Sequence, residues 1–98
     1  MDFKNKAMLV KADGTYEEIF PKNKEDFKLE ELQKYLGGNI QIIQGRGQDS
    51  NIICVLHEEG KLIGLQYNFM ATLIFADILF EGDVIVGDVV ICDSKLVK

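Results

Sequence analysis

The run of β-branched and apolar residues at positions 84–92 constrains the fold of this chain more than any other feature. Residues 81–83 and 93–94, which are typical of turns, bound the run. A strand with one solvated face alternates apolar and polar side chains, whereas a nearly continuous apolar run suits a strand covered on both faces. The run therefore predicts a C-terminal strand with both faces buried. Gly87 lies inside it and indicates either a bulge or a close approach of the backbone to another segment.

Residues 6–20 predict a β-hairpin, because apolar residues recur along two short arms on either side of Asp13 and Gly14. A two-residue type I′ turn needs a positive φ at both central positions, which Asp tolerates and Gly accepts freely. We therefore expect such a turn at these two residues. Pro21 ends the second strand, since proline cannot donate a hydrogen bond to a neighbouring strand.

Residues 29–36 predict a helix with one apolar face, formed by Leu29, Leu32, Tyr35 and Leu36. The following pair, Gly37 and Gly38, supplies a left-handed C-terminal stop. Residues 39–44 and 51–57 then predict consecutive antiparallel strands joined by a loop of glycine and polar residues. A turn is expected at residues 58–61, and residues 62–65 are expected to extend the sheet briefly.

The apolar segment that begins at Asn68 and ends at Phe80 has no single apolar stripe, so periodicity does not decide its structure. Its length, its alanines and Asn68 as an N-cap favour a helix that is buried on most sides or packed against another subunit. A strand is the alternative. The segment is too short to cross a bilayer, which needs about 20 apolar residues.

These patterns together predict an α+β fold with a small antiparallel or mixed sheet. The fold starts as hairpin, helix, strand, strand, which looks like a β-grasp arrangement, and it adds a second apolar helix and a C-terminal strand. The chain has 98 residues and 47% apolar content. A chain of this size fills one core, so we expect residues 1–98 to form a single domain.

The net charge and the cysteine residues of the sequence limit which cellular compartment and which binding partners are expected for this protein. The net charge is −5, and lysines such as Lys22, Lys28 and Lys34 lie near acidic neighbours, which indicates a mixed solvated face. Direct binding to duplex nucleic acid is therefore disfavoured, although a nucleic-acid-binding protein is not excluded as a partner. Cys54 and Cys92 are widely separated and lie in apolar runs, which favours buried, reduced thiols. With no apparent signal peptide, we expect a cytoplasmic protein that does not associate with membranes.

No residue pattern marks a catalytic or metal site. His57 and Cys54 are three positions apart, so on a strand they point to opposite faces and cannot hold one metal. His57 is the only histidine, and no nucleophile is marked out for it. Three aspartates at positions 83, 88 and 93 alternate faces and are expected to mark turns and a bulge. We accordingly expect no catalytic residue, no metal and no cofactor.

Two places in the sequence favour ligand or partner binding. Arg46 is flanked by glycines in a polar loop that lacks the third glycine of a dinucleotide fingerprint, and it could contact an anion. Gln66, Tyr67 and Asn68 combine amides with an aromatic ring at a predicted helix start, where backbone N–H groups point outward. Thr72 completes the set of candidate residues. The alternative for the helix start is an N-cap with local packing and no ligand.

The chain resembles a family of small bacterial, phage and plasmid proteins that carry a domain of unknown function, DUF3846. The resemblance rests on residues 11–19, 29–33 with Gly37-Gly38, 58–62 with Gly64-Leu65, Asn68 with Ala71-Thr72, and Gly82-Asp83 with residues 85–88. It implies a cytosolic protein of bacterial or mobile-element origin and provides no catalytic residues.

The leading functional hypothesis is a non-enzymatic binding module, such as an accessory or host-modulating protein. The apolar surface from Phe69 to Phe80 would contact a protein partner or build a homo-oligomer, because a free monomer rarely exposes such a surface. A second hypothesis is a sponge that sequesters a small nucleotide or another anionic signal, motivated by Arg46 and the segment at 66–68. A third is a small enzyme that uses His57 with acidic partners.

Overall fold

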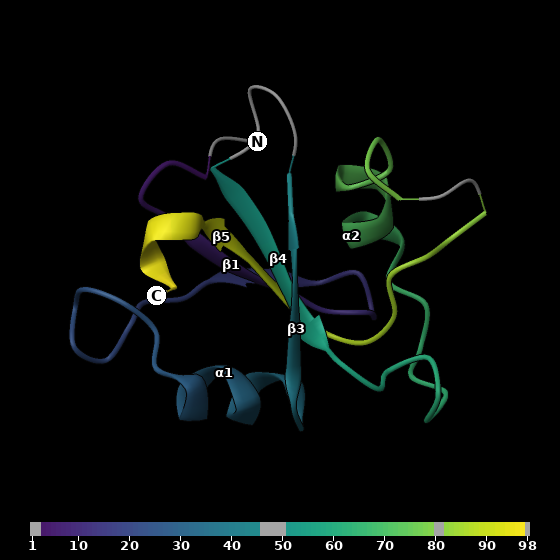
Figure 1. Ribbon diagram of the computed structural model, residues 1–98, viewed down its shortest axis with the longest axis horizontal. Helices are drawn as coiled ribbons and strands as arrows, with labels where there is room; N and C mark the ends of the chain where they lie inside the picture. Colours follow the sequence, from purple (N-terminus) through teal and green to yellow (C-terminus); the bar gives the residue numbers. More distant parts are fainter. Residues whose placement is uncertain (1–2, 46–50, 80–81, 98) are drawn as a thin grey trace.

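The computed structural model describes residues 3–45, 51–79 and 82–97, and its centre is a five-stranded antiparallel sheet (Figure 1). In chain order the strands are β1 (Ala7–Val10), β2 (Tyr16–Glu18), β3 (Ile40–Gln44), β4 (Ile52–His57) and β5 (Val89–Asp93). Their order across the sheet is β2-β1-β5-β4-β3. The helices are α1 (Leu29–Leu36), α2 (Phe69–Ile74) and the short 3-10 helix η2 (Ser94–Leu96). The α+β class is confirmed, whereas the β-grasp resemblance is not.

Strand β5 joins the two halves of the sheet. It pairs with β1 on one side and with β4 on the other, so it connects the β1-β2 hairpin to the β3-β4 hairpin. All five of its residues are buried. Val89 and Ile91 face one apolar cluster, and Val90 and Cys92 face another on the opposite side. The prediction of a strand covered on both faces is confirmed for β5.

The predicted strand over residues 84–92 is too long at its start, because β5 begins only at Val89. Gly87 has a φ of 79° and lies so close to Leu65 that a Cβ on Gly87 would be 2.7 Å from the Leu65 Cδ1 atom. A positive φ interrupts an extended strand, and the absence of a side chain permits the close approach. Of the two explanations for Gly87, the structure shows the close approach.

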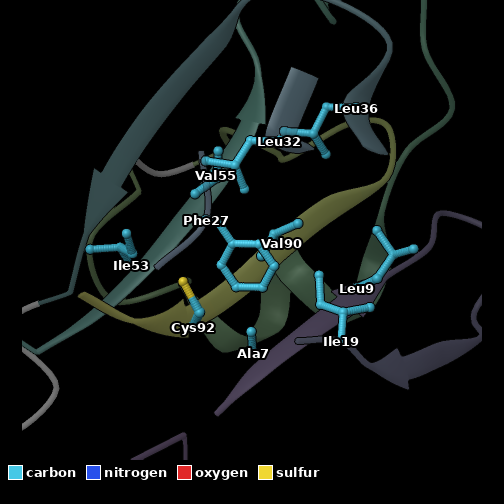
Figure 2. Packing of buried hydrophobic residues seen from close by; sticks show 10 residues of the cluster. All are labelled: Ala7, Leu9, Ile19, Phe27, Leu32, Leu36, Ile53, Val55, Val90 and Cys92. Atoms are coloured by element: carbon cyan, nitrogen blue, oxygen red, sulfur yellow. The ribbon is translucent and has the colours of Figure 1, made fainter. Parts of the chain in front are cut away.

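Helix α1 covers one face of the sheet and has the bounds that the sequence predicts. Gly37 ends it with a φ of 82°, as expected for a left-handed stop. Leu32 and Leu36 are its buried residues, and Figure 2 shows the ring of Phe27 at the centre of the cluster that they join. Burying each such side chain stabilises the fold by about 1.5–3 kcal/mol. The remaining members of this cluster are Ala7, Leu9, Ile19, Ile53, Val55, Val90 and Cys92.

Helix α2 lies on the opposite side of the sheet from α1 (Figure 1), where Ala71 and Phe75 join the second apolar cluster. The helix is shorter than predicted, because it ends at Ile74 and residues 75–78 form turns. Within a single chain it is not buried on most sides, and its packing against another subunit, the other expectation, stays a prediction. Phe69 and Leu73, on its outer side, are 64% and 65% exposed. Phe80 lies outside the described residues.

Two smaller predictions are also corrected. The first hairpin does not have a two-residue type I′ turn: the Lys11 N–H donates to the Thr15 carbonyl at 2.8 Å, and only Gly14 has a positive φ, of 94°. This is a three-residue loop in which glycine takes the left-handed position, and the Asp13 side chain instead accepts from Thr15. Residues 62–65 do not extend the sheet: residues 62–64 form exposed turns after β4, and Leu65 has no regular structure.

The two cysteines are buried on opposite faces of the sheet. Cys54 belongs to the cluster beside α2, and Cys92 belongs to the cluster beside α1. Burial raises the pKa of the Cys92 thiol to about 12, and the neighbouring Asp93 carboxylate adds to the effect. Burial also raises the pKa of Cys54 above its ordinary range. Both groups are therefore neutral thiols at physiological pH, and the thiolate is the reactive form.

We expect neither thiol to react with Ellman's reagent in the native protein at about pH 8, and both to react at once in guanidinium chloride. The reason is burial together with the raised pKa. A fast native reaction, or a Cys54–Cys92 disulfide formed on mild oxidation without unfolding, would contradict this placement.

Candidate functional site

Asn68, one of the predicted ligand residues, is completely buried and fully bonded within the protein. Its Nδ2 group donates to the carbonyls of Val10 and Gly87, at 3.0 and 2.8 Å, and its Oδ1 atom accepts from the Ala71 N–H at 3.0 Å. The first two bonds tie β1 to the segment before β5, and the third caps α2. The amide has no polar atom left for a ligand, so the N-cap interpretation of Asn68 is the one that the structure supports.

Thr72 and the backbone around Asn68 hold the segment before β5 against α2. The Thr72 hydroxyl donates to the Asn68 carbonyl at 2.8 Å and accepts from the Ile85 N–H at 2.8 Å. The Asn68 N–H donates to the Ile85 carbonyl, and the Gly87 N–H donates to the Gln66 carbonyl. Thr72 and the backbone of Gln66 therefore have structural partners.

Gln66 and Tyr67 are exposed, unlike Asn68. The Tyr67 ring meets the Phe69 ring edge to face, with 6.3 Å between ring centroids. Their side chains remain candidates for contact with a partner. Arg46 lies outside the described residues, so the structure does not place it beside the others.

His57 ends β4 and borders a cleft of about 310 Å³. Its Nδ1 atom accepts from the Glu59 N–H at 3.0 Å, and its ring packs so closely on Gly38 that a Cβ there would be 2.5 Å from Nε2. Lys61 and Asp83, which also line the cleft, form an ion pair. The described lining of this cleft contains no Ser, Thr or Cys that His57 could activate.

The Lys61–Asp83 pair is local to this cleft. Hydrogen bonds from the Lys61 ammonium and from the Val84 N–H hold the pKa of the Asp83 carboxyl below its usual range. The other two aspartates of the predicted series accept from different backbone groups, Asp88 from the Ala12 N–H and Asp93 from the N–H groups of Asn5 and Lys95. Each of the three carboxylates therefore accepts hydrogen bonds in a different part of the backbone, and they do not form one site.

A second hollow, which we call the lysine groove, has a volume of about 460 Å³ on the α1 side of the molecule. It lies where the ends of β1 and β5 meet one flank of α1. Residues three and four apart share a helix face, which brings Glu31, Lys34 and Tyr35 together. Its lining residues are Leu9 and Lys11 from β1 and its end, Lys22 from the loop before α1, Glu31, Lys34 and Tyr35 from α1, and Asp88 from just before β5.

The carboxylates of the groove are held by backbone N–H groups rather than by its lysines. Glu31 accepts from the N–H groups of Lys22 and Lys28, each at 3.2 Å. Asp88 accepts from the Ala12 N–H at 3.0 Å. Among the described residues, the ion pairs join Lys28, Lys61 and Lys95 to aspartates and involve none of the groove's lysines. The groove's three lysines therefore form no direct ion pair in the described parts of the chain, although hydrogen bonds from Thr15 and, to a lesser extent, the Lys11 charge lower the pKa of the nearby Asp13 carboxyl. Three lysines and two carboxylates line the groove, so its described lining is positive although the chain has a net charge of −5.

The lysine groove is the feature that the sequence did not reveal. The acidic neighbours of Lys22 and Lys34 in the sequence predict only a solvated, mixed-charge face at these two residues. Lys11 and Asp88 are far from them in the chain. Only the pairing of β1 with β5, and the packing of α1 beside them, brings these residues to one hollow. The one available signal for the groove was that Leu9 and Lys11 are two positions apart in a predicted strand, which places them on the same face.

Among the residues the structure describes, no helix has the length and apolarity needed to cross a membrane. Within the same ranges, no three His, Cys, Asp or Glu side chains are grouped in a way that could hold a metal ion.

The fold and these sites define a small α+β protein whose antiparallel sheet carries a cleft at the end of β4 and the lysine groove beside α1. The model of a family described as a domain of unknown function, DUF3846, matches residues 5–95. This match covers most of the chain, so the protein belongs to the DUF3846 family, as its motifs predicted. A search of curated proteins and a search of solved structures found no match.

Replacing Asn68 by alanine is expected to lower the free energy of unfolding by about 3 kcal/mol, because two buried carbonyls and one helix N–H lose their partner. Urea denaturation measures the change. The control is Asn39→Ala, since Asn39 is exposed and its side chain makes a single 3.3 Å bond with Gln33. Equal stability of the two variants would contradict the anchoring role of Asn68.

Proposed function

We propose that this protein is a non-enzymatic binding protein for a small anionic ligand, and that the lysine groove is its site. The observation that carries the proposal is the group of three lysines in one hollow of an acidic chain, none of which forms a direct ion pair among the described residues. An ammonium group forms strong, charge-assisted hydrogen bonds with phosphate oxygens. A volume of about 460 Å³ is within the range of small-molecule sites.

Nucleotides are the ligand class that the groove favours. Lys11, Lys22 and Lys34 would hold the phosphates, and the partly exposed ring of Tyr35 would stack on the base. Asp88 uses one carboxylate oxygen for the Ala12 N–H, which leaves the other to accept a hydrogen bond from a sugar hydroxyl. The biological role would be sequestration of a nucleotide signal in the cytosol by a protein of bacterial or mobile-element origin.

The double variant Lys11→Gln, Lys34→Gln is expected to bind ADP at least about tenfold more weakly than the wild type, because each lost ammonium removes a charge-assisted contact. Isothermal titration calorimetry at low salt measures the affinity. Binding to the wild type should also weaken as the salt concentration rises, since exposed charges are screened.

The matched control is Lys6→Gln, Lys24→Gln, which changes the net charge equally at two exposed lysines outside the groove. It should retain wild-type affinity. If the two double variants lose affinity equally, the attraction comes from the overall charge and the groove is not the site. If neither ADP nor inorganic pyrophosphate binds the wild type or raises its melting temperature at millimolar concentration, the proposal fails.

The outer face of α2 supports a second candidate function, the binding of another protein. Phe69 and Leu73 are exposed there one turn apart, and the Tyr67 ring packs against Phe69. Aromatic side chains are enriched at the centres of protein interfaces. Phe69 and Leu73 both lie on the surface and belong to the segment predicted to contact a partner, which begins at Phe69 and ends at Phe80.

A photo-crosslinking phenylalanine analogue in place of Leu73 is expected to give one discrete adduct in expressing cells. The same analogue in place of Leu29 is the control, because Leu29 is also apolar and 53% exposed but lies on α1. Identical adducts at both positions, or none at position 73, would contradict a partner-binding role for α2.

A further inference from the structure

The two edge strands of the sheet differ in how they are protected against pairing with another strand. The β2 edge carries the charged residues Glu17 and Glu18. The β3 edge, Ile40–Gln44, contains only isoleucine and glutamine. An edge strand exposes unpaired N–H and C=O groups, and proteins usually protect such an edge with charge, proline or a bulge. By this criterion the β3 edge lacks the protection that β2 has.

The backbone of β3 has its unused hydrogen-bonding groups at alternate residues. Two hydrogen bonds at the ends of the β3-β4 pairing show which β3 residues bond to β4. The Glu58 N–H donates to the Asn39 carbonyl, and the Gly45 N–H donates to the Ile52 carbonyl. Because antiparallel pairs alternate, Gln41 and Ile43 bond to β4, and the N–H and C=O groups of Ile40 and Ile42 point to the open edge. No other described segment pairs with this edge.

The side chains of β3 suit pairing with a second copy of the same strand. Ile42 is 47% exposed although it lies in the middle of the strand. Antiparallel pairing about a two-fold axis at this residue would place it against Ile42 of the partner subunit. On either side of that axis, isoleucine would lie opposite glutamine. No charged side chain would be brought opposite another one, even though both chains carry a charge of −5.

We propose that two copies of this chain associate through antiparallel pairing of their β3 strands, which would form a continuous ten-stranded sheet. Antiparallel strand addition lets the open-edge N–H and C=O groups of Ile42 bond to the C=O and N–H groups of Ile42 of the partner subunit, and the paired isoleucines remove apolar surface from water. The lysine groove is lined from β1 and its end, the loop before α1, α1 and the residue before β5, and its lining contains no β3 residue. Dimerisation therefore leaves the groove accessible and does not depend on its ligand.

The experiment is sedimentation velocity on the full chain from about 1 to 100 μM, comparing the wild type with Ile42→Lys. The lysine would bring like charges together at the two-fold axis, so we expect the dimer dissociation constant to rise at least about tenfold. Leu29→Lys is the matched control, because Leu29 is an apolar residue of similar exposure, 53%, that lies on α1 and in neither proposed interaction surface. The control should dimerise as the wild type does.

A second variant tests the backbone contacts directly. Ile42→Pro removes an N–H that points to the open edge, so the pairing of β3 with β4 should survive while the dimer is lost. Circular dichroism verifies that each variant is folded. The proposal is overturned if the wild type is monomeric at about 100 μM, or if folded Ile42→Lys and Ile42→Pro proteins remain dimeric. It is also overturned if only Leu29→Lys dissociates the dimer, since the interface would then be on α1.

Discussion

The burial of β5 on both faces is the constraint on which the rest of this structure depends. Each of the two hairpins has two edges, and β5 pairs with one edge of each, at β1 and at β4, so that β2 and β3 remain as the edge strands of the sheet. Its side chains then alternate between two apolar clusters, each of which needs a covering layer. Helix α1 covers one cluster and the segment with α2 covers the other. The three-layer arrangement follows from the apolar character of one central strand.

The layer beside α2 relies on polar anchors as well as apolar contacts. Helix α2 has six residues, which is too short to be stable on its own. Asn68 binds three separate backbone groups, and Thr72 adds contacts to Ile85. These bonds are effective because the sites are buried, where an unpaired polar group is costly. Asn68 was a candidate for ligand binding because of its place at a helix start, and the same place gives it a structural role.

The two surfaces proposed for ligand binding and for dimerisation lie at the periphery of the sheet. The lysine groove forms where the ends of β1 and β5 meet α1, and the proposed dimer forms at the β3 edge, on the other side of β5 from β1. Most residues that would hold a ligand in the groove are on a helix or at strand ends, which are rigid supports, and Lys22 comes from the loop before α1. The two surfaces are separate, so a dimer would present two grooves without occluding either.

The sequence by itself determined the elements whose signals are local. The bounds of α1 follow from apolar spacing and from Gly37, the strands of the β3-β4 hairpin follow from their β-branched residues, and the buried thiols follow from their apolar surroundings. Only the tertiary structure decided where the apolar runs end. Gly87 interrupts the last strand through its positive φ, at the point where Leu65 packs against it, and α2 ends at Ile74, where turns follow. The lysine groove was likewise beyond the sequence, since Lys11, Lys34 and Asp88 become neighbours only through long-range strand pairing and helix packing. The spacing of apolar residues along a short segment reflects the backbone conformation that the segment prefers. Contacts between distant residues depend instead on how the helices pack on the sheet.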